Sequence, residues 1–160
     1  MLIEDFSEGS ADRWAYTSDR VMGGVSTGEA LLGRDGDTSF ARLEGEVSTA
    51  NNGGFIQLRQ RAPLALPEQS RGLVLRVRGN GERYYIHLQS TEARRPWQYH
   101  QAAFDSTPDW QEVRLPWEDF RPEGGLDEDF ALDTIRSLGI VAYGRDHRAS
   151  LDVDWVGTYD

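Results

Sequence analysis

The sequence contains no lysine and no cysteine, because all 17 of its basic residues are arginine. Without lysine the chain cannot form a phosphate-binding P-loop, a Schiff base or a lysine general base. Without cysteine it cannot supply a thiol nucleophile, a disulfide, an iron–sulfur cluster or a thiolate zinc site. These two absences exclude several large classes of enzyme and cofactor protein.

Positive charge is also scarce, since 27 acidic residues against 17 basic ones give a formal charge of −10. This balance argues against nucleic acid as a partner, because its binding depends on basic side chains that neutralise phosphates. No apolar stretch approaches the roughly 20 residues that span a bilayer, and the first ten residues lack a basic segment followed by an apolar run. We therefore expect no membrane span and no secretory signal, and a cytoplasmic location. A length of 160 residues fits one domain, residues 1–160.

Apolar and polar residues alternate through most of the chain, which is the pattern of half-buried β-strands. The sequence Gly-Asn-Gly-Glu at 79–82 predicts a hairpin turn between two such strands. A second hairpin turn is expected at 144–148, which includes His147. Only residues 130–137 look helical, over one or two turns, and the acidic segment 118–133 predicts a loop. The expected strands are 1–6, 13–16, 39–48, 55–61, 73–77, 84–88, 97–104, 110–115, 137–143 and 151–159.

Glycine and proline recur between these strands at the spacing of an all-β sandwich. The inward positions of the expected strands define the core. Its predicted members are Phe6, Trp14, Leu43, Val47, Ile56, Leu58, Leu73, Leu75, Val77, Ile86, Leu88, Val113, Leu115, Leu138, Ile140 and Val153.

Two segments with paired glycines stand out, SDRVMGGVS at 18–26 and NNGGF at 51–55. Paired glycines permit positive φ and close approach of backbones, and asparagine tolerates the left-handed conformation. The two loops could lie side by side at one end of a sandwich, either as structural corners or as a binding surface. The candidate binding residues are Asp19, Arg20, Met22, Gly23, Gly24, Ser26, Asn51, Asn52, Gly53, Gly54 and Phe55.

With these loops, Arg59 after NNGGF, the LPWEDF segment at 115–120 and IRSLGI at 135–140, the chain resembles the complex I intermediate-associated protein family. The best-known members are mitochondrial assembly factors for NADH:ubiquinone oxidoreductase, and this chain resembles the short, stand-alone bacterial members. The resemblance implies a galactose-binding-like jelly roll of two antiparallel sheets. It also implies a non-catalytic, chaperone-like role that binds a protein partner or assists assembly, with no cofactor and no catalytic residue to carry over.

The outward positions of the central strands suggest an alternative site. Aromatic rings, imidazoles and guanidinium groups on one concave sheet face suit a polyhydroxylated or anionic ligand, because rings stack on apolar faces and planar donors bind oxygen atoms. Carbohydrate binding is therefore the alternative function, and an ordinary polar sheet face is the alternative interpretation. The residues expected on this face are Arg59, Arg76, Tyr85, His87 and His100.

The sequence gives less support for a metal site or a catalytic site than for these two binding surfaces. Glu4, Asp5, Asp152 and Asp154 on the terminal strands could hold a structural calcium, but protection of exposed strand edges is the favoured explanation. His87 and His100 could lie close together on neighbouring strands, but a zinc site needs a third ligand at a defined spacing, and none is indicated. No G-x-S-x-G is present either. A small hydrolase is a minor alternative, and we expect no catalytic residue.

Overall fold

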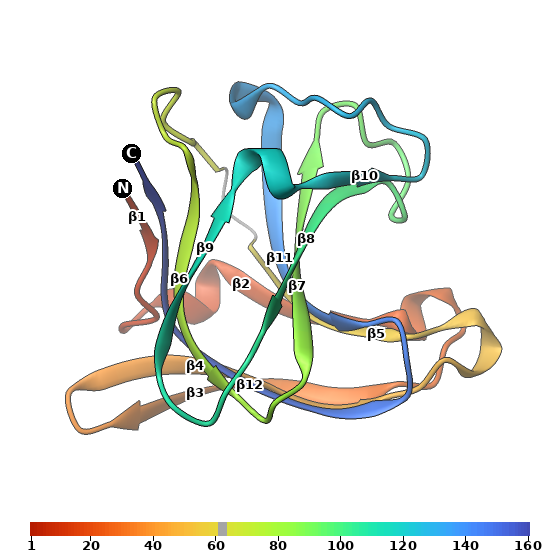
Figure 1. Ribbon diagram of the computed structural model, residues 1–160. Coiled ribbons are helices and arrows are strands. Elements are labelled where there is room, and N and C mark those ends of the chain that lie inside the picture. Colours follow the sequence, from red (N-terminus) through yellow and green to blue (C-terminus); the bar gives the residue numbers. More distant parts are fainter. Residues whose placement is uncertain (61–63) are drawn as a thin grey trace.

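The computed structural model describes residues 1–60 and 64–160 and shows two antiparallel, six-stranded sheets packed face to face (Figure 1). In the first sheet the order is β3-β4-β12-β6-β9, with β1 paired to β12. Its strands are β1 (Leu2–Glu4), β3 (Thr27–Asp35), β4 (Thr38–Val47), β6 (Gly72–Gly79), β9 (Gln111–Pro116) and β12 (His147–Tyr159).

The second sheet has the order β10-β8-β7-β11-β5-β2. Its strands are β2 (Trp14–Ser18), β5 (Phe55–Gln60), β7 (Arg83–Ser90), β8 (Tyr99–Asp105), β10 (Arg121–Glu123) and β11 (Ile135–Tyr143). The predicted all-β, jelly-roll-type sandwich of two antiparallel sheets is confirmed.

Short 3-10 turns are the helical elements of the described residues, and none of them is long or apolar enough to cross a membrane. They are η1 (Ser10–Asp12), η2 (Asp19–Met22), η3 (Ala50–Asn52), η4 (Trp117–Asp119) and η5 (Leu132–Thr134). The helix predicted over 130–137 is wrong beyond the single turn η5, because β11 already begins at Ile135. The last residue of the predicted strand 55–61 lies outside the described residues.

The core lies between the sheets and contains the predicted residues, except that Val113 is only partly buried. Tyr84 is the largest fully buried side chain, and its hydroxyl donates to Asn80 Oδ1 at 2.6 Å. The N-terminal amine donates to the carbonyl oxygen of Thr158 at 3.0 Å, so both ends of the chain lie side by side (Figure 1).

Both predicted hairpins are wrong in the same way. The turn at 79–82 joins β6 of the first sheet to β7 of the second, and the turn at 144–148 joins β11 to β12 across the sandwich. Asn80 Nδ2 donates to the carbonyl oxygen of Arg148 at 2.8 Å, which ties the two crossings together. The turn residues were placed correctly, but the strands that they join pair with other neighbours.

Two strands have no counterpart among the predicted ones. Strand β3 is an edge strand whose residues are all exposed or intermediate, so it lacks the alternation that marks a half-buried strand. Strand β10 spans three residues within the predicted acidic loop and pairs with β8.

Candidate functional site

The two glycine loops lie against each other and are joined by one buried carboxylate, that of Asp19. Its oxygens accept hydrogen bonds from Ser26 N at 3.0 Å, Ser26 Oγ at 2.6 Å, Gly54 N at 2.6 Å and Phe55 N at 3.3 Å. Burial alone would raise the pKa of Asp19, but these hydrogen bonds outweigh it and lower the pKa. The expected juxtaposition of the loops is confirmed, and Asp19, which is fully buried, joins them from inside.

The paired glycines are needed because Asp19 leaves no room beside it. A Cβ atom at Gly24 or Gly53 would collide with the Asp19 side chain. Asn51 and Asn52 adopt φ of 57° and 60°, the left-handed conformation expected of asparagine at such a corner. Close packing around one carboxylate therefore explains Gly24 and Gly53, whereas Gly23 and Gly54 are explained by their positive φ.

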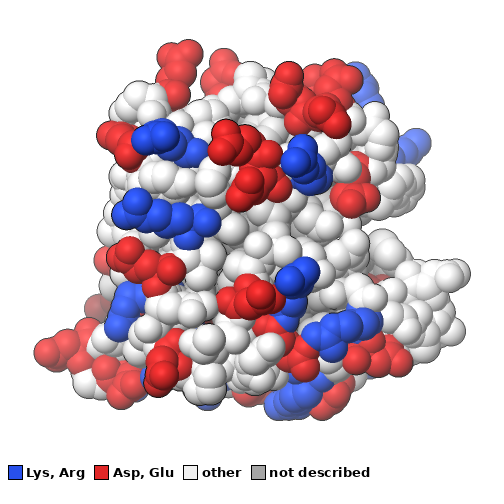
Figure 2. All heavy atoms as spheres, in the orientation of Figure 1, with Lys and Arg blue, Asp and Glu red and all other residues white. Residues whose placement is uncertain are grey.

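These loops form one wall of a cleft of about 450 Å³ that opens over the outer face of the second sheet. Figure 2 shows the molecule hollowed on the right between an upper and a lower projection, and the tip of the lower one is uncharged on the face in view. The cleft unites the two candidate surfaces, because its lining includes Asn52 and Phe55 from the loops and Arg59 and His87 from the sheet face.

An aromatic cluster forms one side of the floor. His87 stacks on Tyr99 with ring centroids 3.7 Å apart, and Tyr143 lies edge-on to His87 at 5.5 Å. Burial lowers the pKa of His87 to about 4, while its Nε2 lies 2.9 Å from Gln101 Oε1. The ring is therefore neutral at pH 7 and offers an aromatic surface rather than a charge.

Arg59 lies on the other side of the floor, at the position opposite Gly139 in the β5–β11 ladder. Its Nη2 donates to Gln89 Oε1 at 2.6 Å and to Ser137 Oγ at 3.3 Å, both of which are neutral. It is the one charged side chain among the described residues that line the cleft. Gly139, which also faces His87 in the β11–β7 ladder, has no side chain, so the flexible end of Gln57 lies over the centre of the floor.

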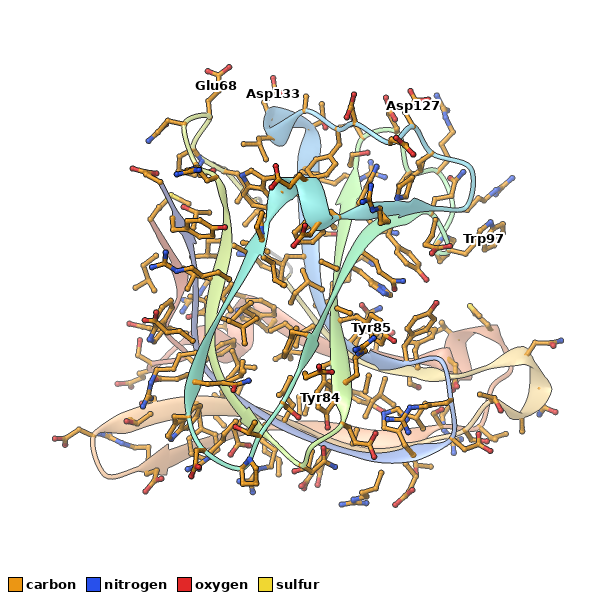
Figure 3. All side chains as sticks on the ribbon, in the orientation of Figure 1. Glu68, Tyr84, Tyr85, Trp97, Asp127 and Asp133 are labelled. Carbon is orange, nitrogen blue, oxygen red and sulfur yellow. The ribbon has the colours of Figure 1, made fainter. Side chains whose placement is uncertain are left out.

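The rim of the cleft carries three exposed apolar side chains, of which only Met22 is among the predicted binding residues. Val21 (75% exposed) and Met22 (49%) in η2 edge the wall formed by the loops, and Trp97 (59%) edges the opposite wall. Figure 3 places Trp97 on the upper projection and Tyr85 on the second sheet below it. Two features of the sequence could have identified Val21 and Trp97 as site residues. Val21 belongs to the SDRVMGGVS segment, and Trp97 follows a proline in a loop.

The comparison with protein families agrees with the resemblance noted in the two loops. The family model described as complex I intermediate-associated protein 30 (CIA30) matches residues 4–153. The chain belongs to the CIA30 family. The match covers both glycine loops, every strand that lines the cleft and most of the first sheet.

Among solved structures, this CIA30-family chain is similar to the family 11 carbohydrate-binding module of a cellulosomal cellulase of Clostridium thermocellum. The TM-score is 0.79 at 14% sequence identity, and the match covers 99% of this chain and 93% of that one. The same module in complex with a β-1,3-1,4-mixed-linked tetrasaccharide gives 0.78, 15% identity, and 99% and 94% coverage. An agarase gives 0.64 and 9% identity, with 100% of this chain matched to 24% of that chain. At such identities the similarity establishes the shared fold.

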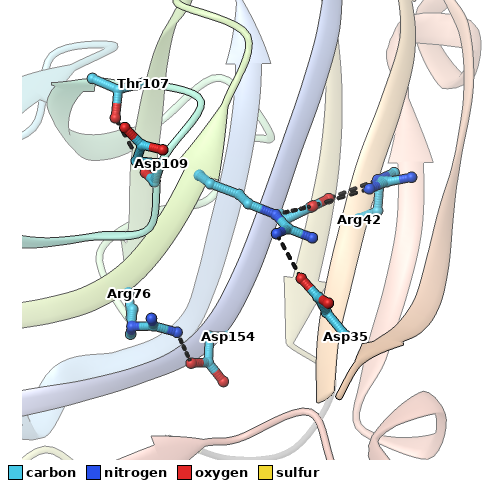
Figure 4. Close-up of polar contacts among 8 residues, drawn as sticks. Asp35, Arg42, Arg76, Thr107, Asp109 and Asp154 are labelled. Carbon is cyan, nitrogen blue, oxygen red and sulfur yellow. Dashed lines mark hydrogen bonds and ion pairs between the residues drawn. The ribbon is translucent and has the colours of Figure 1, made fainter. Parts of the chain in front are cut away.

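Not all residues predicted for the sheet face of this CIA30-family protein lie there. Arg76 lies on β6 of the first sheet, where its Nη1 donates to Asp154 Oδ2 at 2.6 Å (Figure 4). Its prediction as a site residue beside Tyr85 is wrong, because the chain crosses to the other sheet between them.

His100 is likewise misplaced by the prediction. It is fully buried against Phe130, with Nε2 2.7 Å from the carbonyl oxygen of Asp127. Its neighbour Tyr99 faces the cleft instead, so the parity of β8 is the reverse of the one expected.

The calcium alternative is also wrong. Glu4 accepts hydrogen bonds from Arg13 and Trp14, and Asp5 accepts one from Ser7. Asp152 accepts hydrogen bonds from Arg42 and Arg78. No three potential metal ligands lie together in the residues that the structure describes. Edge protection does not explain Asp152 and Asp154 either, because β12 lies in the middle of its sheet, where they bind arginines of the neighbouring strands.

Proposed function

We propose that this CIA30-family chain is a non-catalytic module that binds a protein partner in the cleft and so assists the assembly of a larger complex. The observation that carries the proposal is the exposed apolar rim formed by Val21, Met22 and Trp97 around a preformed cleft. Exposed apolar groups gathered at a concave surface are typical of interaction sites, and tryptophan, tyrosine and arginine dominate the binding energy of protein interfaces. The family's description, which names an intermediate of complex I, supports a protein partner.

Rigidity of the cleft supports the same proposal. Asp19 ties both loops to each other through four hydrogen bonds, and the His87–Tyr99 stack fixes the aromatic side of the floor. A wall held in this way loses little conformational entropy when a partner binds, which favours affinity.

The composition of the cleft supports a non-catalytic role. Its lining in the described residues includes no carboxylate, and His87 at a pKa of about 4 is a poor proton acceptor at pH 7. The carboxylate pair Asp127 and Asp129 is exposed on a surface loop away from this lining.

We further propose that residues 1–160 act as one domain in the cytoplasm. Support for one domain comes from the single apolar cluster to which both sheets contribute. Support for a reducing compartment comes from the absence of cysteine.

Affinity capture from a native extract tests partner binding. We expect the wild type to retain a defined set of proteins that Val21→Asp and Trp97→Ala lose, while Leu32→Ser retains it. Leu32 is a matched control, since it is 53% exposed but lies on β3 outside the cleft. Recovery of the same proteins by all four chains would contradict the proposal.

A carbohydrate or similar polyhydroxylated ligand is the second candidate. It is favoured by the stacked His87 and Tyr99 rings beside the amide groups of Gln57 and Gln89, a combination that suits sugar rings and hydroxyls. The carbohydrate-binding modules of similar fold support it as well.

Titration with a β-1,3-1,4-linked glucan tetrasaccharide, followed by tryptophan fluorescence and amide chemical shifts, tests the second candidate. If it holds, shifts concentrate at the cleft and Tyr99→Ala weakens binding. Absence of any shift at millimolar tetrasaccharide contradicts binding of this class of sugar.

A further inference from the structure

The electrostatic character of the cleft differs from that of the whole molecule. The chain carries a formal charge of −10, yet no Asp or Glu is among the described residues that line the cleft. Arg59 provides one positive charge there, and His87 provides none because burial lowers its pKa to about 4. Arg59 is therefore the charge that lines the cleft, while the carboxylate of Glu123 on the neighbouring strand β10 acts on Tyr99 at the aromatic side of the floor.

The guanidinium of Arg59 is held in place without being neutralised. Its Nη2 donates to Gln89 and Ser137, and it forms no ion pair with a carboxylate of the described residues. By contrast, Arg76 and Arg78 on the first sheet are bound by Asp154, Asp152 and Asp35 (Figure 4). Nε and Nη1 of Arg59 have no acceptor among the described residues, and a carboxylate is the acceptor that an arginine fork fits best.

Access to Arg59 is open from above. Gly139 lies between Arg59 and His87 across the two ladders and has no side chain, so the flexible end of Gln57 lies over the middle of the floor, and Arg59 itself is exposed. The apolar groups that a ligand must pass are Val21 and Met22 on one wall and Trp97 on the other. A fitting ligand therefore combines apolar groups on its flanks with one anionic group directed at the floor.

We propose that the cleft takes an extended acidic peptide segment of the partner, whose carboxylate binds Arg59 while apolar side chains beside it pack on Val21, Met22 and Trp97. This inference rests on the proposed partner-binding function. A peptide fits better than a sugar acid because valine and methionine side chains at the rim match apolar side chains rather than hydroxyl groups.

Acetylated, amidated decapeptides provide the probe, arrayed with varied apolar flanks and with glutamate, glutamine or lysine at the centre. We expect glutamate-centred peptides to bind best and their glutamine counterparts to bind at least about tenfold more weakly, because a charge-assisted pair is lost. Arg59→Gln should reduce this discrimination to less than about twofold, while Arg148→Gln should leave it unchanged. Arg148 is the control because it is exposed on β12 beside Glu46, outside the cleft.

Further arms identify the site and the source of the carboxylate. Gly139→Leu fills the floor and should abolish binding, and equal binding by this variant would place the peptide elsewhere and overturn the inference. Peptides with a free C-terminus and no glutamate test whether the bound carboxylate is that of a chain terminus rather than of a side chain. Binding from either source should depend on Arg59.

The remaining outcomes separate this inference from the proposed function. Equal affinity for glutamate and glutamine peptides would overturn the acidic segment but leave partner binding in the cleft intact. Failure of every peptide, together with Arg59-dependent binding of an oligogalacturonate, would overturn both in favour of an acidic carbohydrate. Failure of both probes, with capture from extract still dependent on Trp97, would refute the peptide segment alone.

Discussion

Replacement of Asp19 by alanine should destabilise the protein far more than its position in a loop suggests. The carboxylate is fully buried. It accepts hydrogen bonds from the backbone N–H groups of Ser26, Gly54 and Phe55 and from the hydroxyl group of Ser26. The Ser26 hydroxyl keeps an alternative acceptor in the carbonyl oxygen of Ser48 at 3.2 Å. The two shorter backbone bonds, at 3.0 and 2.6 Å, have no such alternative among the described residues.

Each buried donor without an acceptor costs about 1–3 kcal/mol, and water that enters the vacated space reduces this cost. We therefore expect Asp19→Ala to lower the free energy of unfolding by about 3–4 kcal/mol and Asp19→Asn by roughly half of that. For a domain of this size the loss corresponds to a fall in melting temperature of roughly 10 °C.

Urea denaturation followed by tryptophan fluorescence and calorimetry would measure both quantities. Asp37→Ala, an exposed acidic residue in the β3–β4 turn, is the matched control and should change stability by less than about 0.5 kcal/mol. A loss below about 1 kcal/mol for Asp19→Ala would refute the argument that its carboxylate organises the cleft wall.

Three further predictions concern the floor of the cleft and the first sheet. Burial lowers the pKa of His87 from 6.5 to about 4, so on acidification the unfolded state takes up a proton before the folded state does. The free energy of unfolding should therefore fall between pH 6.5 and 4, by at most about 3 kcal/mol. In urea denaturation at several pH values, His87→Gln should show a smaller fall over this range. Gly139→Leu should block binding in the cleft yet change the melting temperature by less than about 5 °C, because only the flexible end of Gln57 must move to make room for the new side chain. Asp152→Asn should lower the free energy of unfolding by about 1–2 kcal/mol, because Arg42 and Arg78 lose the carboxylate that they share. The difference from the wild type should shrink in about 1 M salt, which screens the ion pairs. Calorimetry at low salt and at high salt would measure the loss and its salt dependence.

Much of the fold follows from the sequence, because alternation of apolar residues reports which strands are half-buried. The core positions of β6 and β7 could be predicted since Leu73 to Val77 and Tyr84 to Leu88 alternate clearly. Strand β3 escaped prediction because an edge strand with exposed side chains has no such alternation. The pairing of β6 and β7 could not be predicted either. An Asn-Gly turn such as Asn80-Gly81 is as suitable for a connection between two sheets, which is what the structure shows, as for a hairpin.

Prediction of the site succeeded where local conformation dictates the residue. The glycine pairs and Asn51 follow from positive φ and close packing, and these requirements are readable in the sequence. The placement of Arg76 and His100 failed because it depends on which sheet a strand joins and on the parity of β8, both of which are set by tertiary packing. The role of Asp19 was likewise hidden, since only the structure shows its carboxylate turned inward.

If the cleft is the surface that binds the partner, residues at its rim must lie in contact with that partner. Site-specific photo-crosslinking in a native extract tests it most directly, with a photoreactive phenylalanine analogue in place of Met22 at the rim or of Leu32 on β3. We expect a discrete crosslinked partner from the position of Met22 that is lost when Trp97→Ala is added, and none from the position of Leu32. The same adduct from both positions, or an adduct from Leu32 alone, would contradict it.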